Sequence, residues 1–513
     1  MSFSTVHARG QSGIDAPPVT VETHLSHGLP AFNLVGLAET AVRESKERVR
    51  SAIINAGFDF PLKRITINLA PADMPKTGTR FDLAIALGIL VSSGQVPKQV
   101  LARIECIAEL ALNGSLRGVG KILPAALASE KSANSVLVAN SDIDEASLVS
   151  DLIVYSATDL ASICRTALDE ESLTSLKADT VAGTPGSEDS ENAADLVDVD
   201  GQHKARRALE IAAAGGHHLL MIGSPGTGKT MLATRLPGLL PKMCKQEAFD
   251  SAKIWSVSKQ GFDIDRWRHR PFRSPHHTCS QAALIGGGST PSPGEVSLAH
   301  HGILFLDELP HFQKHTLEVL REPLENREVT ISRAMAVNKF PANFHLVAAM
   351  NPCPCGNYGD RNADCICRPD QIEKYLQKIS GPLIDRIDLQ VNVPRTKPLY
   401  HRQESQTNES SSVVAARVTQ AYARQLARQG VSNRFVSDAA LKQRNVLPQP
   451  LIRFLDQAAT QFKLSARGYF KILKVARTIA DLADSDAIEK EHLAEAFGYR
   501  YLDDLLRQLH LTR

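Results

Sequence analysis

The segment from Gly223 to Thr230 has residue types and a spacing that suit phosphate binding. It fits the phosphate-binding-loop pattern, with an apolar run at 218–222 before it and a helical stretch at 231–236 after it. In such a loop, backbone N–H groups face the phosphates, a lysine reaches the β- and γ-phosphates, and a threonine ligates Mg²⁺. The predicted nucleotide-binding residues are Gly223, Ser224, Pro225, Gly226, Thr227, Gly228, Lys229 and Thr230.

Two later segments place polar side chains directly after apolar strand-like runs. Asp307 and Glu308 follow one such run, and Asn351 follows another. Ligands bind at the carboxyl ends of strands in open α/β sheets, so these side chains should face the phosphate loop. We expect Asp307 to hold Mg²⁺ with Thr230, Glu308 to polarise an attacking water, and Asn351 to position that water or the γ-phosphate. The alternative for Asn351 is a simple Asn-Pro turn. Together these motifs predict hydrolysis of a nucleoside triphosphate.

Four of the eight cysteines lie close together as two Cys-x-Cys pairs, namely Cys353, Cys355, Cys365 and Cys367. In a reducing compartment, clustered cysteines more often bind metal than form disulfides. Four thiolates suit a tetrahedral structural Zn²⁺ site, although one intervening residue per pair is fewer than in most zinc sites. Free loop thiols and a redox pair are the alternatives.

The segment 266–273 combines basic residues with Trp267 and Phe272. Basic side chains follow phosphates and aromatic faces stack on bases, so this segment is a candidate DNA contact through Arg268 and Arg273. The alternative is a solvated run of charges, with Trp267 in a subunit interface.

Blocks of different composition must position these residues. The first block, 1–166, mixes strand-like runs such as 64–69 with a buried-helix pattern at 81–91, whereas 167–197 is acidic and poor in large apolar residues. The remaining blocks are 198–395, where strand-like runs (218–222, 303–306, 344–348) alternate with helical stretches, and 396–513, with helical spacing at 411–428 and 469–483. We therefore predict an α/β protein with an α+β N-terminal domain, a flexible linker, a parallel-sheet core and a helical C-terminal domain.

The charge balance is nearly neutral. The 513 residues include 58 Lys+Arg and 56 Asp+Glu, and 43% are hydrophobic. These values exclude global disorder and disfavour a constitutively basic coat protein, so any cations that hold a polyanion must be concentrated locally. The chain has neither a signal-like start nor an apolar run long enough to span a membrane, which predicts a cytoplasmic protein without membrane contact.

The order of these motifs resembles that of AAA+ ATPases, and longer segments resemble the magnesium-chelatase-like YifB/ComM family. The segments are Val-Asp-Gly-Gln at 199–202, Arg-Ser-Pro-His-His-Thr at 273–278, Asn-Pro-Cys-Pro-Cys-Gly at 351–356 and Ser-Ala-Arg-Gly at 465–468. The similarity covers nearly the whole chain except the acidic linker. It implies an AAA+ fold for 198–395, a magnesium-chelatase-type helical lid for 396–513, and ATP with Mg²⁺ as cofactors.

The resemblance also implies residue roles. Lys229 and Thr230 match the Walker A pair, Asp307 and Glu308 the Walker B pair, and Asn351 sensor 1. Arg386 matches the arginine finger that reaches a neighbouring subunit's γ-phosphate, and Arg467 matches sensor 2, which acts from the neighbour in related helicases. The ATP site would then be complete only between subunits. The alternative for Arg386 is an ordinary surface Asp–Arg pair.

The N-terminal block resembles the Lon-protease-type fold of the ribosomal-protein-S5-like class. Residues 75–80 and 109–124 resemble the stretches that carry the Lon catalytic serine and lysine, but those positions are Arg80 and Leu123 here. Because a nucleophile needs its base, we expect no peptidase chemistry and interpret this block as a scaffold or a DNA-facing ring.

Two inserted hairpins are further features of the family, and they match 273–295 and 328–343. In related helicases the second hairpin enters the central pore and moves with the ATP state. Arg333 and Lys339 are therefore candidate DNA contacts, and exposed edge-strand charges are the alternative.

Taken together, the resemblance implies a hexameric ATP-dependent DNA helicase or translocase that promotes branch migration during natural transformation and homologous recombination. Its partners would be single-stranded, double-stranded and branched DNA. The alternatives are a chelatase-type motor that inserts Mg²⁺ into a porphyrin and a protein-remodelling motor. The fused N-terminal block, the four-cysteine loop and the basic–aromatic segment favour the DNA motor over the chelatase.

Overall fold

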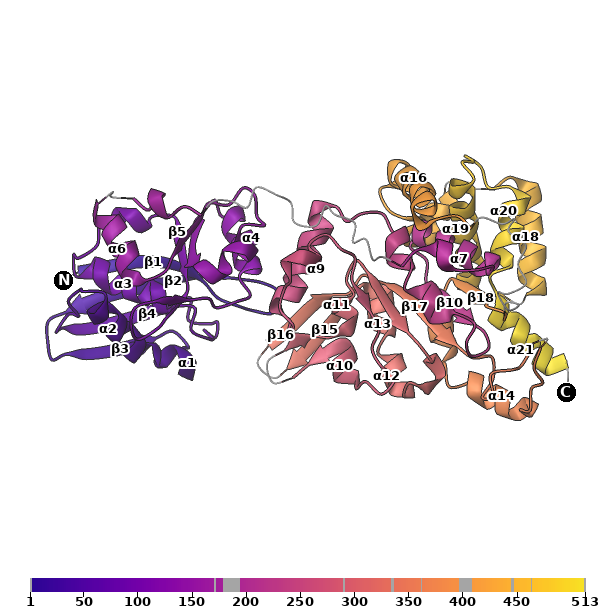
Figure 1. Ribbon diagram of the computed structural model, residues 1–513, viewed down its shortest axis with the longest axis horizontal. Helices are drawn as coiled ribbons and strands as arrows, with labels where there is room; N and C mark the ends of the chain where they lie inside the picture. Colours follow the sequence, from indigo (N-terminus) through magenta and orange to yellow (C-terminus); the bar gives the residue numbers. More distant parts are fainter. Residues whose placement is uncertain are drawn as a thin grey trace. The chain divides into compact units, whose positions relative to one another are not determined.

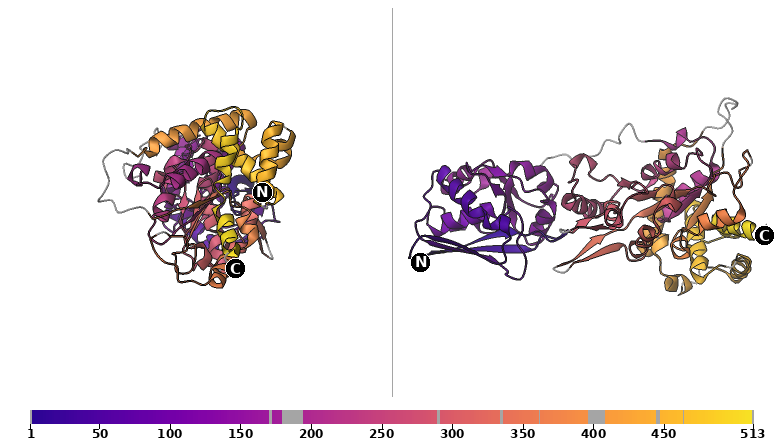
Figure 2. Two further views of the ribbon diagram at one scale, coloured as in Figure 1. Left: turned by 90° about the vertical axis from the view of Figure 1, so that its right-hand side faces the viewer. Right: turned by 90° about the horizontal axis from the view of Figure 1, so that it is seen from below.

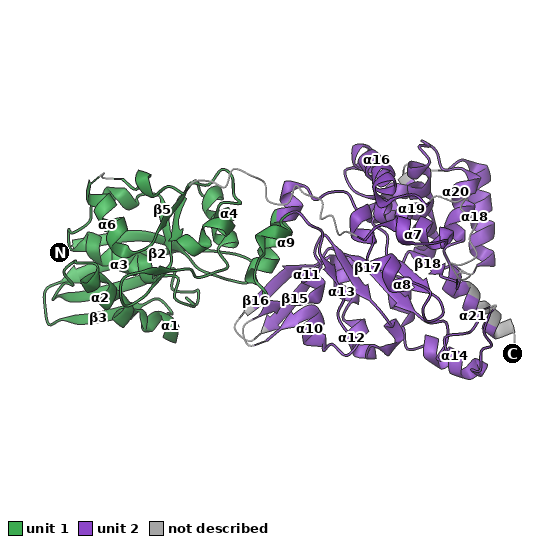
Figure 3. Cartoon of the chain, viewed as in Figure 1, with its two compact units in different colours: residues 1–187, 249–267 green, residues 188–248, 268–513 purple. Residues whose placement is uncertain are grey.

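The computed structural model describes residues 2–169, 172–178, 194–288, 291–333, 336–360, 362–395, 408–443, 447–462 and 464–511. They form two compact units (Figure 3). The first comprises Met1–Ser187 and Phe249–Trp267, and the second comprises Glu188–Ala248 and Arg268–Arg513. The expected domain boundaries at 166, 197 and 395 remain predictions.

The expected acidic linker, 167–197, lies largely outside the described residues. Its first residues belong to the N-terminal unit, because helix α6 (Leu160–Asp169) extends into it, Leu173 is buried, and Lys177 forms a β-bridge with Tyr155. At the other end, the Asp195 side chain caps the short turn η4 (Leu196–Asp198).

A seven-stranded mixed sheet forms the first unit (Figure 1). In spatial order its strands are β3 (Ala31–Val35), β4 (Arg64–Ala70), β2 (Pro18–Ser26), β1 (Ser2–Arg9), β5 (Ile104–Ile107), β8 (Ser135–Ala139) and β9 (Val154–Ala157). The predicted strand at 64–69 is confirmed as β4, whose side chains alternate between buried and partly exposed. Its buried side chains turn inward because successive residues of a strand point to opposite faces.

The apolar run at 81–91 forms helix α3 (Asp82–Ser92), as predicted. Nearly all of its residues are buried, and it contacts β1, β2 and β5. The other helices of this unit are α1 (Thr40–Arg43), α2 (Ser45–Asn55), α4 (Leu123–Lys131) and α5 (Ile143–Ala146), and a small hairpin joins β6 (Glu109–Leu110) to β7 (Leu116–Arg117).

The two positions that match the Lon catalytic residues are both buried. Arg80 is 5% exposed and donates a hydrogen bond to the Gly10 carbonyl at 3.2 Å. Burial lowers the pKa of Arg80 to about 10. Leu123 lies in the apolar interior at the start of α4.

The second unit contains the predicted parallel sheet. In spatial order its strands are β11 (Phe272–Arg273), β14 (Ile303–Leu306), β17 (His345–Met350), β10 (Leu219–Ile222) and β18 (Leu389–Asn392), and every neighbouring pair is parallel. The three expected strands are confirmed as β10, β14 and β17. Strand β10 lies between β17 and β18, so its carboxyl end is flanked by loops from both.

The second unit also contains helices, and the predicted C-terminal ones are confirmed as α16 and α19. The helices are α7 (His203–Gly215), α8 (Lys229–Ala233), α10 (Gln281–Ile285), α11 (Glu295–Leu298), α12 (Lys314–Glu318), α13 (Arg321–Asn326), α14 (Pro369–Leu376), α15 (Gly381–Ile384), α16 (Ser411–Gln429), α17 (Asp438–Gln443), α18 (Gln449–Gln461), α19 (Ala466–Leu482), α20 (Lys490–Phe497) and α21 (Tyr501–Leu511). Helix α9 (Lys245–Val257) begins in the second unit, and its residues from Phe249 onward belong to the first (Figure 3).

One apolar core joins the sheet to the C-terminal helices. Leu219 and Met221 of β10 belong to the same cluster as Val418 of α16 and Ile472 of α19. Figures 1 and 2 show these helices, coloured orange to yellow, gathered beside α7, which both α16 and α19 contact. The parallel sheet with its helices and the helical C-terminal region are consistent with an AAA+ fold.

Both expected hairpins are present in different forms. The first is short: α10 precedes the two-residue strands β12 (Gly286–Gly287) and β13 (Ser292–Pro293). The second pairs six residues on each side, β15 (Glu328–Arg333) with β16 (Ala336–Pro341). Among the described residues, no helix combines the length and apolarity that a membrane crossing requires.

Candidate functional site

The phosphate-loop motif lies where the parallel sheet can present it. The Gly223 N–H donates to the Met350 carbonyl of β17 at 3.2 Å, which fixes the start of the loop. A Cβ at Gly223 would lie 2.2 Å from the Val393 carbonyl oxygen, so only glycine permits this approach to the chain after β18. Gly228 has a φ of +87°, a left-handed conformation that turns the loop into α8.

The Lys229 ammonium lies buried inside this loop. Its Nζ donates to the carbonyls of Gly223 at 2.8 Å and Ser224 at 2.9 Å, and to Oδ1 of Asn351 at 3.3 Å. The pKa of Lys229 is lowered by burial, and the charges of Asp307 and Glu308 partly offset this effect. The structure thus brings together the predicted lysine and Asn351, with three neutral acceptors that an anion could replace.

The two expected Mg²⁺ ligands, Thr230 and Asp307, are in direct contact. The Thr230 hydroxyl donates to Oδ2 of Asp307 at 2.8 Å. Hydroxyl and carboxylate oxygens are the donors that Mg²⁺ prefers, so this pair fits the ion. Glu308 follows with a left-handed backbone, φ +51°, and its Oε2 lies 3.5 Å from Nδ1 of His277.

The four cysteines form a compact cluster. The three sulfur–sulfur distances among Cys353, Cys355 and Cys365 are 3.4, 3.7 and 3.6 Å, and one Sγ from each of the four residues lies within 4.8 Å of the others. A tetrahedron with Zn–S bonds of about 2.3 Å has edges of about 3.8 Å, so the sulfur positions fit a zinc ion. All four cysteines are free thiols in this structure.

The cysteine loop lies directly against the phosphate loop. A Cβ at Gly356 would lie 2.5 Å from Cδ of Pro225, and the Ser224 hydroxyl donates to Oδ2 of Asp360 at 2.9 Å. Arg395 pairs with the same carboxylate at 3.0 Å. A cavity of about 480 Å³ lies between these loops and the end of β18, with Gly223, Ser224 and Asp360 among its lining residues. The phosphate loop and the cysteine loop therefore share a packing contact and a hydrogen bond.

Arg386 and Arg467 come together at another place. Both contact the carboxylate of Glu325, with N···O distances of 2.5 Å for Arg386 and 3.6 Å for Arg467. Within the described part of the chain, their hydrogen bonds and ion pairs go to Glu325 and the Pro382 carbonyl, and none goes to the phosphate loop.

The basic–aromatic segment differs from its expected form. Trp267 is 4% exposed and its ring lies 5.0 Å from that of Phe249, so its face is not available to stack on a base. Arg268 is exposed, as a phosphate contact requires. Arg273 instead pairs with both oxygens of Glu295, at 2.6 and 2.8 Å, and this pair would have to open before Arg273 could bind DNA. DNA contact by either arginine remains a prediction.

The second hairpin carries the other two candidate cations. Lys339 of β16 is 63% exposed and pairs with Glu328 of β15 at 2.9 Å. Arg333 ends β15, and its side chain lies outside the described residues. Both roles remain predictions.

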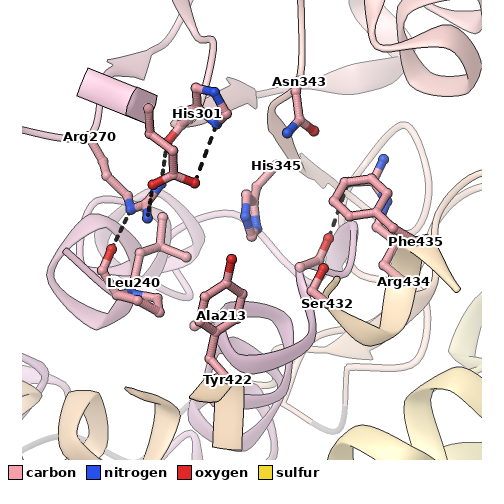
Figure 4. Close-up of a pocket in the computed structure, with 13 residues that line it drawn as sticks. Ala213, Leu240, Arg270, His301, Asn343, His345, Tyr422, Ser432, Arg434 and Phe435 are labelled. Atoms are coloured by element: carbon pink, nitrogen blue, oxygen red, sulfur yellow. Dashed lines mark hydrogen bonds and ion pairs between the residues drawn. The ribbon is translucent and has the colours of Figure 1, made fainter. Parts of the chain in front are cut away.

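A second, smaller cavity lies at the amino ends of the strands (Figure 4). It has a volume of about 60 Å³, and its lining includes His345 of β17, Tyr422 of α16, Arg270 before β11 and Arg434 after α16. Among the residues that the structure describes, Nδ1 of His345 is buried and has no hydrogen-bond partner. Burial, followed by the charges of Arg434 and Arg270, lowers the pKa of His345 to about 3, so this imidazole is neutral at physiological pH.

The fold places further residues near the site. His277, which the sequence suggests as a loop or phosphate contact, lies against Glu308. Asp360 of the cysteine loop, for which the sequence suggests no role, contacts the phosphate loop. The position of His277 in the family-like segment 273–278 and of Asp360 in the cysteine loop could have identified them from the sequence. No sequence signal pointed to Glu325, because the two arginines that it contacts are distant from it in sequence.

Comparisons with known proteins cover the whole chain. Residues 195–400 match the family model for magnesium chelatase, subunit ChlI; residues 21–142 match that for subunit ChlI of Mg-chelatase; and residues 408–500 match that for its C-terminal region. The chain is 47% identical over 510 residues to the competence protein ComM of Haemophilus influenzae, covering 99% of each chain. It is 45% identical over 514 residues to the uncharacterized protein YifB of Salmonella typhimurium, covering 100% of this chain and 99% of that protein. The chain therefore belongs to the magnesium-chelatase-like ComM/YifB family.

Proposed function

We propose that this protein is an ATP-driven DNA motor that assembles into a hexameric ring and promotes branch migration of DNA during natural transformation and homologous recombination. The observation that carries the ATPase part is the convergence of Lys229, Thr230, Asp307 and Asn351 at the carboxyl ends of neighbouring parallel strands. The DNA part is supported by the similarity to a competence protein over the full chain.

The residues of the site have distinct tasks in this proposal. Thr230 and Asp307 would hold Mg²⁺, which when bound neutralises charge on the phosphates. Lys229 exchanges its carbonyl partners for phosphate oxygens. Glu308 accepts a proton from the attacking water, and Asn351 orients that water or the γ-phosphate.

The position of the two arginines supports the proposed assembly. Because Arg386 and Arg467 contact Glu325 and not the phosphate loop, they suit a role at the nucleotide of a neighbouring copy. Each subunit would then supply a phosphate loop to one site and two arginines to the next. Such a ring also multiplies the few cations of each hairpin around a central pore.

The central test is ATP hydrolysis with and without single-stranded DNA, followed by unwinding of forked DNA and branch migration of a four-way junction. The expected result is DNA-stimulated hydrolysis and ATP-dependent strand movement, with both activities lost in Glu308→Gln. Stimulation by a porphyrin or a protein partner, and none by DNA, would instead support the chelatase-type or protein-remodelling motor.

We also propose that the cysteine cluster binds a structural Zn²⁺, because its sulfur positions fit a tetrahedron. Metal analysis of protein purified without a histidine tag should find about one zinc per chain. The double variant Cys355→Ser, Cys365→Ser should lose it, whereas Cys244→Ser, outside the cluster, should keep it. A content below about 0.2 zinc per chain would contradict the proposal.

A further inference from the structure

One carboxylate connects two arginines that lie far apart in sequence. Oε2 of Glu325 contacts Arg386 at 2.5 Å, and Oε1 lies 3.6 Å from Arg467. Arg386 follows the short helix α15, Arg467 lies in the first turn of α19, and Glu325 belongs to α13. The three residues thus join different elements of the second unit at one surface point.

The carboxylate makes this arrangement electrostatically possible. Two guanidinium groups that contact the same carboxylate repel each other, and the negative charge between them offsets this repulsion. Each arginine uses a different oxygen of Glu325, so one negative charge compensates both. The hydrogen bond from Arg386 lowers the pKa of Glu325, and this keeps it ionised at physiological pH.

The two arginines are held to different degrees. Arg386 is 11% exposed and also donates to the Pro382 carbonyl at 2.8 Å, whereas Arg467 is 61% exposed. Guanidinium groups recognise phosphate groups through paired, charge-assisted hydrogen bonds, so two of them beside one carboxylate suit a phosphate ligand. Fixing them before the phosphate arrives removes the ordering cost from the moment of reaction.

We propose that Glu325 is a positioning residue that joins Arg386 and Arg467 into one phosphate-recognising unit, directed at the nucleotide of a neighbouring copy of this chain. The inference rests on the proposed ATPase function and adds to it the residue on which both arginines depend. Glu325 itself does not touch the nucleotide.

The variant that tests this is Glu325→Gln, which keeps the size of the side chain and removes its charge. In the assembled protein, kcat for ATP hydrolysis should fall about tenfold or more, because the transition-state charge loses two oriented donors. KM for ATP should stay within about twofold of the wild-type value, since the phosphate loop that binds ATP is unchanged. Glu325→Asp, which retains the charge, should recover part of the lost turnover.

A matched control is Glu409→Gln. Glu409 is 51% exposed and pairs with Arg417, whereas Glu325 is 54% exposed, so both variants remove a half-exposed carboxylate from an arginine. Turnover of Glu409→Gln should match the wild type. Circular dichroism of each variant establishes that it is folded.

Mixed rings distinguish positioning across a subunit interface from a local structural effect. Glu325→Gln subunits keep an intact phosphate loop, and Lys229→Ala subunits keep an intact arginine pair. Mixing the two variants should therefore restore part of the turnover that each lacks alone. A variant that had only lost its own fold would not be rescued.

The outcomes separate the two proposals. Unchanged or increased turnover in Glu325→Gln, together with loss of turnover in Arg386→Ala, would overturn the role of Glu325 and leave the ATPase function in place. A KM effect without a kcat effect would also overturn it. Absence of ATP hydrolysis in the wild-type protein, with or without DNA, would overturn both.

Discussion

At the scale of single residues, the Lys229 ammonium in the nucleotide site has hydrogen-bond partners that phosphate oxygens can replace. Lys229 is buried, yet in the described structure its hydrogen bonds go to neutral oxygens and not to a carboxylate. A buried ammonium that is not hydrogen-bonded to an anion is costly, and burial accordingly lowers its pKa, although the charges of Asp307 and Glu308 partly offset this effect. A phosphate group in the loop would provide the missing negative charge, so binding should depend strongly on this one side chain.

Lys229→Ala should therefore weaken ATP binding by about a hundredfold or more, because the phosphates lose a charge-assisted hydrogen bond in a water-poor site. Titration with a fluorescent ATP analogue measures the affinity. Lys63→Ala, which removes an exposed lysine of the N-terminal unit, should bind like the wild type. Retained affinity in Lys229→Ala would show that the phosphate site lies elsewhere.

The hairpin pair Lys339–Glu328 allows a test by opposite changes. If Lys339 contacts DNA, Lys339→Ala should weaken binding of single-stranded DNA and reduce the salt slope by about 0.7 per chain. Glu328→Gln should strengthen binding, since it frees the lysine from its carboxylate. Fluorescence anisotropy at several salt concentrations measures both effects. Equal DNA affinities and salt slopes of the two variants would mean that the Lys339–Glu328 pair only stabilises the hairpin.

At the scale of elements, the cysteine loop and the phosphate loop form one assembly. Their contact depends on the absence of a side chain at Gly356, which lies against Pro225. A metal in the cysteine cluster would stiffen this loop and thereby support the phosphate loop. In the described residues, the side-chain hydrogen bonds of Lys229 and Thr230 go to other partners than the four cysteines.

Two glycine substitutions test this contact. Gly356→Ala should weaken ATP binding about tenfold, or about 1.4 kcal/mol, because the new methyl group displaces Pro225. Gly359→Ala is the matched control: its φ of +78° resembles the +84° of Gly356, but its Cβ would approach only the Tyr501 hydroxyl, at 3.7 Å. Both variants therefore place a side chain at a left-handed backbone position, but only Gly356→Ala produces a steric clash. Equal affinities of the two variants would refute the coupling.

At the scale of the whole molecule, the second unit joins its sheet to its C-terminal helices through an apolar core and a polar cavity. The cavity holds His345 as a neutral imidazole close to Arg434 and Arg270, and its Nδ1 has no hydrogen-bond partner in the described part of the chain. Protonation there would place a third positive charge among two arginines. The junction should therefore become less stable in acid.

The direction of this pH effect follows from the different protonation of His345 in the folded and the unfolded protein. An unfolded chain protonates His345 below about pH 6.5, whereas the folded protein does so only near pH 3, so acidification favours unfolding across that interval. His345→Gln should reduce the loss of stability between pH 7.5 and pH 5.5 by about 1.4 kcal/mol. Urea unfolding at both pH values measures it. His27→Gln, at an exposed site, should keep the wild-type pH dependence, and an identical dependence in His345→Gln would contradict the assignment.

The sequence by itself determined the contiguous features of this protein. The phosphate loop, the acidic end of β14 and the amphipathic helices α16 and α19 are recognisable because their signals lie in neighbouring residues or in a regular period. The parallel sheet followed from the alternation of strands and helices. The cysteine cluster was also visible, since its two pairs lie close together along the chain.

Only the tertiary structure decided which distant residues meet. Glu325 joins two arginines from other elements, Gly356 meets Pro225, and Trp267 is buried beside Phe249 although its sequence context suggested a base-stacking surface. Such contacts depend on how elements pack, and residue type alone does not specify the neighbour. The physical reason is that local propensity and periodicity act over a few residues, whereas burial and charge pairing are settled when separate elements close on one another.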